Sequence, residues 1–261
     1  MKLNTKDWQL PTFELTEFKS KTKKYCLCIP VVNEGEKFQK QIQALKRYTD
    51  LVDVIIADGG SKDGSTDKKF LKINGVSALL VKTSPGRQGT QLRMAFSYAL
   101  QKGYDGVITV DGNGKDGIEA IPAFVKALTE GNDCIAGSRF IKGGKASNTP
   151  PGRLIGIRAV GSPILSIAAK KWWTDVTNGF MAYSKAYLLD PQVKPFRDIF
   201  VSYELLFYLD IRASQLGLKT KEIPVTRQYP KDKIPTKITG WKGNLNVFKT
   251  FVKVGMGDYN P

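Results

Sequence analysis

Between residues 25 and 139, short apolar runs alternate with segments of helical periodicity, and this alternation limits the possible folds more than any other feature of the chain. The expected strands cover 25–32, 52–58, 76–83, 106–111 and 133–139, and the expected helices cover 34–49, 65–73, 88–103 and 117–131. Strands that alternate with helices form a mostly parallel sheet with helices on both faces. The sequence therefore predicts an α/β fold.

Both ends of the chain depart from this rhythm. The first 22 residues are polar and are expected to form an N-terminal arm, and residues 227–261 form a basic C-terminal tail. Residues 154–173 are expected to be helical. Residues 245–255 carry apolar side chains at helical spacing; we expect them to pack on the domain, with contact to an anionic membrane surface as the alternative. No repeat is visible, so we expect one domain over 1–261.

The charge balance and the missing histidines restrict function. Forty Lys and Arg against 24 Asp and Glu give a formal net charge of +16, which favours anionic partners: nucleic acid, lipid or phosphorylated small molecules. No helix-turn-helix, zinc or RNA-recognition signature is present, so nucleic acid is not the expected partner. The absence of histidine excludes a Ser-His-Asp triad and a histidine general base.

The cellular location is expected to be cytoplasmic. The start of the chain has no apolar signal-peptide region, and the longest candidate span, "SPILSIAA", is too short to cross a bilayer. Cys26, Cys28 and Cys134 fit a reducing compartment and are expected to pack in the core. A peripheral position on the inner face of the cytoplasmic membrane remains an alternative.

Polar side chains follow three of the expected strands, at the edge where parallel sheets bind ligands. Pro30 leads into Asn33 and Glu34, a second strand ends at Asp58, and a third ends at Asp111 and continues into "GNGKD". Each alone could be a turn or a helix cap, but a cluster of carboxylates favours a bound cation. We expect Asp111 and Asn113 to hold Mg²⁺ or Mn²⁺ and, through it, a diphosphate, with Gly112 allowing the backbone to approach the ligand.

The motifs "IPVVNEGEKF", "DVIIADGGSKDGSTD" and "VITVDGNGKDGIEAIPAF" resemble family 2 glycosyltransferases, which have the Rossmann-like GT-A fold. "AGSRFIKGGK", "DVTNGFMAYSKAYL" and "SYELLFYLDIRASQLGLKTKEIPV" resemble the dolichyl- or polyprenyl-phosphate mannosyltransferase branch and its bacterial relatives. The matches extend from residue 25 to about residue 230. The resemblance implies inverting, metal-dependent transfer of a sugar from a nucleotide-diphosphate donor to a polyprenyl phosphate or a glycan in cell-envelope synthesis.

The resemblance also assigns roles to individual residues. The strand-end positions that it implies for the nucleoside are Pro30, Asn33, Glu34, Asp58 and Gly60. Asp111 and Asn113 match the family's D-x-D motif, with Asn113 in place of the second acid. Arg139 and Asp175 fall on motifs near the acceptor and the reacting centre, and Met181 stands where related enzymes often have arginine.

Two interpretations come from residue chemistry alone. Glu204 is the candidate general base, because a carboxylate is the natural choice where histidine is absent; a surface helix acid is the alternative. Arg227 and Lys233, with Lys231 and Lys237, lie in a basic segment broken by prolines that could close over a diphosphate and exclude water, or could be a solvated loop.

Two other functions stay open at this point. The charge of +16 suggests a basic nucleic-acid-binding protein. The predicted sheet would also suit a nucleotidyltransferase, but that class usually has a glycine-rich basic loop after the first strand, where this chain has the acidic "VVNEGEKF".

Overall fold

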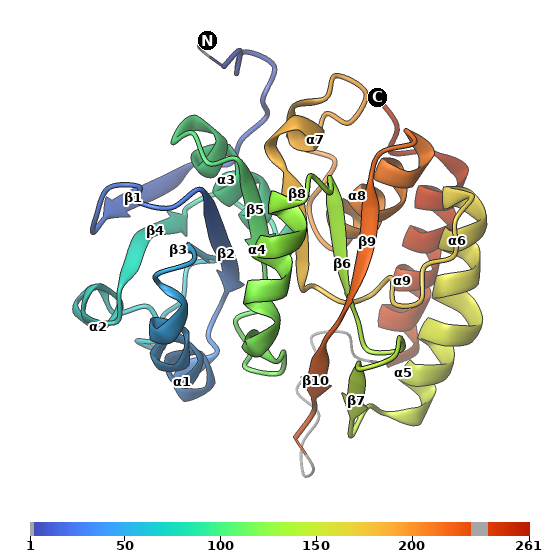
Figure 1. Cartoon of the computed structure of the whole chain (residues 1–261), viewed down its shortest axis with the longest axis horizontal. Coiled ribbons are helices and arrows are strands. Elements are labelled where there is room, and N and C mark those ends of the chain that lie inside the picture. The colour runs from blue at the N-terminus through green and yellow to red at the C-terminus, as the bar shows by residue number, and fades with distance from the viewer. Residues whose placement is uncertain (1–2, 231–239) are drawn as a thin grey trace.

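The computed structural model describes residues 3–230 and 240–261, and its centre is an eight-stranded sheet in the order β1-β4-β3-β2-β5-β8-β6-β9 (Figure 1). Six strands run in one direction, while β1 and β8 run against their neighbours, which confirms the predicted mostly parallel sheet. The strands are β1 (Phe13–Glu17), β2 (Tyr25–Val31), β3 (Asp53–Asp58), β4 (Val76–Lys82), β5 (Gly106–Thr109), β6 (Cys134–Ser138), β8 (Met181–Ser184) and β9 (Thr220–Pro224).

Helices cover both faces of the sheet, as predicted. One face packs against α1 (Gly35–Leu45), α2 (Lys68–Ile73) and α4 (Ile121–Thr129), with the short turns η1 (Lys46–Tyr48) and η2 (Ile118–Ala120) at their ends. The other face packs against α3 (Gln88–Gln101), α7 (Lys185–Leu189) and α8 (Glu204–Gln215). The side chains of β2 alternate between these two cores: Cys26 and Cys28 lie in one, Leu27 and Ile29 in the other. All three cysteines are buried, which confirms their packing role.

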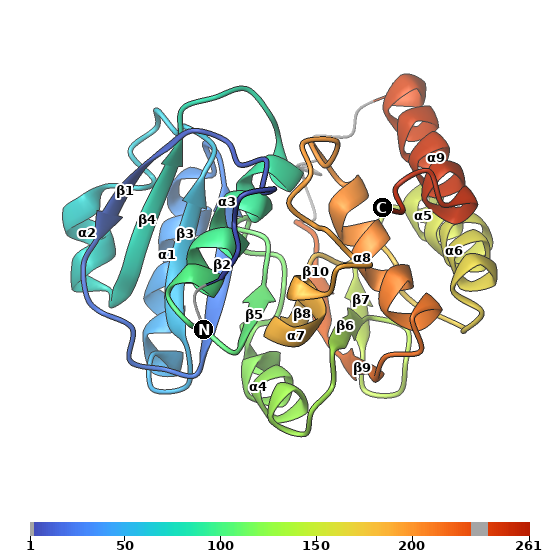
Figure 2. The same cartoon turned by 90° about the horizontal axis from the view of Figure 1, so that it is seen from above.

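A helical layer outside α8 closes one end of the molecule (Figure 2). It consists of α5 (Pro151–Ile155), the π-helix η3 (Gly156–Gly161), α6 (Ser162–Ala169) and α9 (Gly240–Met256). Phe251 and Val254 of α9 are buried, and the Phe251 ring lies 4.8 Å from that of Phe207 on α8. The predicted packing of α9 on the domain is therefore confirmed.

The segments α5, η3 and α6 form one continuous helix, Pro151–Ala169. It has 19 residues. Its most apolar stretch of 18 residues has a mean hydropathy of 1.2, and 33% of that stretch is buried. The expectation that no segment is long enough to span a membrane is thus wrong by length and composition, although core helices of soluble proteins meet the same criterion. The expectation failed because glycines and an arginine interrupt the apolar run without ending the helix.

The expected N-terminal arm is wrong for residues 13–17. These residues form the edge strand β1, which pairs antiparallel with β4 from Phe13 opposite Lys82 to Glu17 opposite Ala78. Before it, the Trp8 ring stacks on Phe196 with 4.0 Å between ring centroids. An edge strand with one open face carries polar residues, so its composition resembles that of an arm.

Candidate functional site

The carboxyl ends of β2, β3 and β5 meet at one edge of the sheet, as predicted, and the carboxyl end of β6 lies at the same edge. The loops after β2 and β3 are joined there: Lys62 N donates to Asn33 Oδ1 at 2.8 Å, and Gly35 N donates to an Asp63 carboxylate oxygen at 2.9 Å. Asn33 adopts a left-handed φ of 51° to make this turn. Pro30, Asn33 and Glu34 line the cavity at this edge.

Asp58 is buried and holds its own loop together. One carboxylate oxygen accepts from Gly60 N at 3.0 Å, from Ser61 N at 2.8 Å and from the Ser61 hydroxyl at 2.7 Å. The other oxygen accepts from the Thr66 hydroxyl at 2.7 Å. Gly60 has a φ of +90°, which favours glycine in this tight turn. Asp58 therefore has a structural role in the described loop, and its nucleoside contact remains a prediction.

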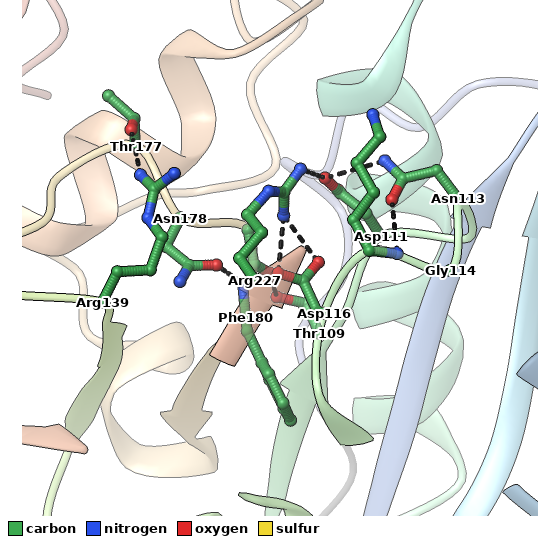
Figure 3. Close-up of polar contacts among 12 residues, drawn as sticks. Thr109, Asp111, Asn113, Gly114, Asp116, Arg139, Thr177, Asn178, Phe180 and Arg227 are labelled. Atoms are coloured by element: carbon green, nitrogen blue, oxygen red, sulfur yellow. Dashed lines mark hydrogen bonds and ion pairs between the residues drawn. The ribbon is translucent and has the colours of Figure 1, made fainter. Parts of the chain in front are cut away.

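Asp111 lies at the centre of a polar network (Figure 3). Its Oδ1 accepts from Gln88 Nε2 at 2.9 Å, and its Oδ2 accepts from the Arg227 guanidinium at 3.0 Å and, more weakly, from Asn113 Nδ2 at 3.4 Å. The Asn113 side-chain oxygen accepts from Lys115 N at 3.2 Å. The two expected metal ligands thus lie side by side.

Arg227 joins this network from β10 (Thr226–Gln228), which pairs with β7 (Lys145–Ser147) in a separate two-stranded parallel sheet. Its guanidinium donates to both oxygens of Asp116 at 2.6 Å. Burial lowers the pKa of Arg227, but Asp116 and Asp111 raise it further, so the pKa lies well above its usual range. Sequence reasoning placed Arg227 at a diphosphate but missed Asp116, which is 111 residues away from it in the chain.

The 111–114 loop is fixed by α1 and β2. Gln41 donates to the Asp111 carbonyl oxygen at 3.0 Å and accepts from Gly114 N at 3.0 Å. A Cβ on Gly112 would lie 2.9 Å from the Pro30 carbonyl oxygen and 3.0 Å from Val31 Cβ. Glycine is therefore needed at this position because the loop packs on β2, whereas the sequence analysis attributed it to approach of a ligand.

Arg139 and Asp175 form a buried, bidentate ion pair. The Arg139 guanidinium donates to the two Asp175 oxygens at 2.6 and 2.7 Å and to the Thr177 hydroxyl at 3.0 Å. Arg139 lines the cavity, and Asp175 lies behind it with no exposed surface. Next to this pair, Asn178 accepts from Phe180 N at 3.0 Å, while its buried Nδ2 has no hydrogen-bond partner within the described residues. No feature of the sequence singles out Asn178.

Two further predicted residues are Glu204 and Lys233. Glu204 is buried at the start of α8, where one carboxylate oxygen accepts from the backbone N–H groups of Val201 and Ser202. These bonds hold the loop before the helix, and the general-base role remains a prediction. Lys233, with Lys231 and Lys237, lies outside the described residues.

The cavity that these groups line has a volume of about 1290 Å³ and two chemically different halves. The strand-end half carries basic and polar side chains, among them Arg87, Gln88 and Arg227. The opposite half lies among η3, α8 and α9 and is lined by apolar side chains: Ile157, Val160, Leu206, Phe207, Phe248 and Phe251. A pocket of this volume is large enough for two substrates.

The side chains at the strand ends do not fit a divalent cation well. Both Asp111 oxygens already accept hydrogen bonds, and one of those donors is a guanidinium. Asn113 brings no charge, and both Asp116 oxygens bind Arg227. Over residues 3–230 and 240–261, no group of three or more His, Cys, Asp or Glu could hold a metal ion. The expected Mg²⁺ or Mn²⁺ site is therefore not supported by the donor set.

Solved structures with the same fold include glucosyl-3-phosphoglycerate synthase from Mycobacterium tuberculosis in complex with Mn²⁺, UDP and glucosyl-3-phosphoglycerate. Its TM-score is 0.62 at 16% identity, covering 90% of this chain and 79% of that one. The same enzyme in complex with Mg²⁺ and UDP gives a TM-score of 0.61 at 17% identity, with 90% and 78% covered. At this identity the likeness shows the GT-A fold.

Curated relatives are similar over most of the chain. An undecaprenyl-phosphate mannosyltransferase of Micrococcus luteus is 29% identical over 203 residues, covering 76% of this chain and 81% of the relative. A polyprenol monophosphomannose synthase of Mycolicibacterium smegmatis is 24% identical over 213 residues, covering 78% and 77%. The family model described as Glycosyl transferase family 2 matches residues 26–190. This protein is thus a glycosyltransferase that belongs to glycosyl transferase family 2.

Proposed function

We propose that this glycosyltransferase moves a sugar, with inversion, from a nucleoside-diphosphate sugar to a polyprenyl phosphate. The observation that carries this proposal is the two-part cavity: basic side chains at the strand ends and an apolar region among η3, α8 and α9. The first half suits the donor diphosphate and the acceptor phosphate, and the second suits the first isoprene units of a lipid. A free sugar or polar glycan would leave the apolar half exposed to water.

The reaction needs little from a general base. An oxygen of the acceptor phosphate forms a bond to the sugar C1 as the bond from C1 to the donor diphosphate breaks, and the nucleoside diphosphate leaves with that electron pair. A single displacement of this kind inverts C1. Because an ionised phosphate oxygen makes the attack, no proton has to be removed from the attacking atom. This agrees with a Glu204 carboxylate that has one oxygen engaged by two backbone amides.

A lipid acceptor requires contact with a membrane surface. The outer helical layer exposes large apolar side chains: Ile167 is 79% exposed, and Ile155, Phe248 and Met256 are exposed on the same layer. Trp172, three residues after the end of α6, is 60% exposed. Lys249 and Lys253 of α9 add positive charge, which anionic lipids attract. We infer that this layer rests on the inner face of the cytoplasmic membrane beside the apolar half of the cavity.

The named relatives suggest the first substrates to test. One is named as an undecaprenyl-phosphate mannosyltransferase and another as a polyprenol monophosphomannose synthase. The protein would be incubated with labelled GDP-mannose, UDP-glucose or other nucleotide sugars and undecaprenyl phosphate in detergent. Transfer of label into the organic phase, with the opposite anomeric configuration by NMR, is the expected result.

Asp111→Ala is the variant that tests the site, and Lys72→Gln, an exposed change on α2, is its control. Loss of transfer in Asp111→Ala alone would support the strand-end site. Label found only on water-soluble glycans would show that the lipid acceptor is wrong. Label released as free sugar, with no acceptor modified, would contradict transfer altogether.

A further inference from the structure

Three cations gather around a single aromatic ring at the cavity wall. The Lys115 ammonium lies 5.3 Å from the centroid of the Tyr229 ring, and the Arg153 and Arg227 guanidinium carbons each lie 5.7 Å from it. Arg153 also donates to the Tyr229 hydroxyl at 3.2 Å. We call these four residues the Tyr229 cluster; Tyr229, Lys115 and Arg227 are buried, and all four line the cavity.

Like charges held this close destabilise one another unless an anion balances them. Burial lowers the pKa of Lys115, and the neighbouring Arg227 lowers it further. The Tyr229 ring offsets part of this repulsion through cation–π contacts, and Asp111 and Asp116 neutralise Arg227. The arrangement is therefore organised to receive negative charge beside Asp111, where the sequence analysis expected a metal ion.

The charge balance of the whole cavity agrees with this. Among the described lining residues, six are basic: Lys37, Arg87, Lys115, Arg139, Arg153 and Arg227. Glu34 and Asp111 are the lining acids, and Asp116 and Asp175 pair with lining arginines from behind. These described residues thus carry an excess of two positive charges, which would balance the two negative charges of an ionised diphosphate diester.

A divalent cation at Asp111 would act against this balance. It would have to displace the Arg227 N–H from Asp111 Oδ2 and would then lie near Lys115 and Arg153. Arg227 is buried and Asp111 is partly buried, so separating this hydrogen-bonded ion pair is costly.

We propose that the Tyr229 cluster binds the donor diphosphate directly and takes the place of a divalent cation in this chain. This inference rests on the proposed transfer from a nucleoside-diphosphate sugar, which brings the diphosphate to the site. It assigns two roles within the cluster: Lys115 and Arg153 contact the phosphates, and Arg227 forms an ion pair with the Asp111 carboxylate.

Calorimetric titration of the full chain with UDP, GDP and inorganic pyrophosphate tests the inference. Each titration would be run with EDTA and again with Mg²⁺ or Mn²⁺. We expect binding in EDTA that changes less than about threefold when metal is added, well below a tenfold effect of 1.4 kcal/mol. Lys115→Gln and Arg153→Gln should each weaken binding by about 10-fold to 100-fold, the loss of one charge-assisted contact. Lys72→Gln should bind as the unmodified protein does.

Asn113→Asp supplies a second test that does not depend on removing a cation. It restores a second carboxylate beside Asp111, so binding in EDTA should weaken and Mn²⁺ should now strengthen it. Circular dichroism would show that each variant is folded.

Binding of the unmodified protein only when Mg²⁺ or Mn²⁺ is present would overturn the inference and leave the proposed transfer intact. Equal affinity of Lys115→Gln, Arg153→Gln and the unmodified protein would also overturn it. Failure to bind any of the three probes, with or without metal, would count against both the inference and the proposed donor.

Discussion

The buried ion pair between Arg139 and Asp175 permits a quantitative prediction. Replacing Asp175 by Asn keeps the side-chain volume but removes the charge, while the Arg139 guanidinium stays 2% exposed. Burial lowers the pKa of Arg139, and in the unmodified protein the Asp175 carboxylate raises it more. Without that carboxylate the guanidinium still keeps its proton, because arginine is not deprotonated in proteins, so the charge stays buried and unpaired. Breaking such a pair costs about 3–5 kcal/mol.

This loss is large enough to measure by heat. With an unfolding entropy of about 2.1 cal/mol/K per residue, a loss of about 4 kcal/mol lowers the Tm of a chain of 261 residues by roughly 7 °C. Differential scanning calorimetry of the unmodified protein and Asp175→Asn gives the difference directly. Urea titration at 25 °C gives the corresponding change in the free energy of unfolding.

Two controls separate charge burial from general damage. Glu130→Gln removes an exposed carboxylate that lies 3.0 Å from the Lys221 ammonium, and it should leave the Tm unchanged. Replacing both members of the buried pair, Arg139→Met with Asp175→Leu, should recover most of the lost stability, because no unpaired charge remains. If Asp175→Asn shifts the Tm no more than Glu130→Gln does, the reasoning about a dry, uncompensated arginine is refuted.

Three further outcomes are expected. Burial, together with nearby carboxylates, raises the pKa of Asp210 in the folded protein well above 3.8, although a hydrogen bond from a tyrosine hydroxyl opposes this. The contribution of Asp210 to the free energy of unfolding is therefore fully present below the pKa that it has in the unfolded chain, and it is lost as pH rises through the folded-state pKa. The stability of Asp210→Asn relative to the unmodified protein should therefore rise with pH in urea titrations, and a flat difference would contradict this. Gly179→Ala would place a Cβ 2.8 Å from an Asp111 oxygen and should weaken UDP binding by about 10-fold to 100-fold with little change in Tm; unchanged binding would show that Asp111 can move freely. Ile167→Glu and Trp172→Glu should each reduce co-sedimentation with phosphatidylglycerol vesicles by about tenfold while leaving UDP binding unchanged, and equal co-sedimentation would place the membrane contact elsewhere.

The half of the fold between residues 25 and 139 follows from the sequence because its strands are almost wholly apolar and its helices are periodic. The helix predicted over 65–73 begins later, at Lys68, because Asp67 caps it by accepting from Phe70 N at 2.7 Å. Short or half-exposed strands such as β1 and β10 carry too few residues to show the apolar run or the apolar-polar alternation that identifies a strand in a sequence. Their identity depends on pairing partners distant in the chain.

The site, too, has features that the sequence predicts and features that depend on contacts between distant residues. The convergence of Asn33, Asp58 and Asp111 at one edge follows from the parallel direction of their strands. The pairing of Arg227 with Asp111 and Asp116 does not, since these residues are more than 100 positions apart and come together only through β10. From the sequence, the carboxylates are therefore expected to bind an external cation, whereas in the folded chain the Arg227 guanidinium binds them.

The reversed direction of β8 has a consequence for how such a site can diversify. β8 lies between β5 and β6, so the loops that begin at Asp111 and Arg139 start two strand spacings apart, about 10 Å. The chain enters the sheet here at the edge where its neighbours leave it, and the residues just before β8 contact both sides: Thr177 binds Arg139, and Gly179 lies beside Asp111. In the transfer proposed above, the β5 side would hold the leaving nucleotide and the β6 side the incoming nucleophile. One inverted strand would then allow the two substrate specificities to evolve separately.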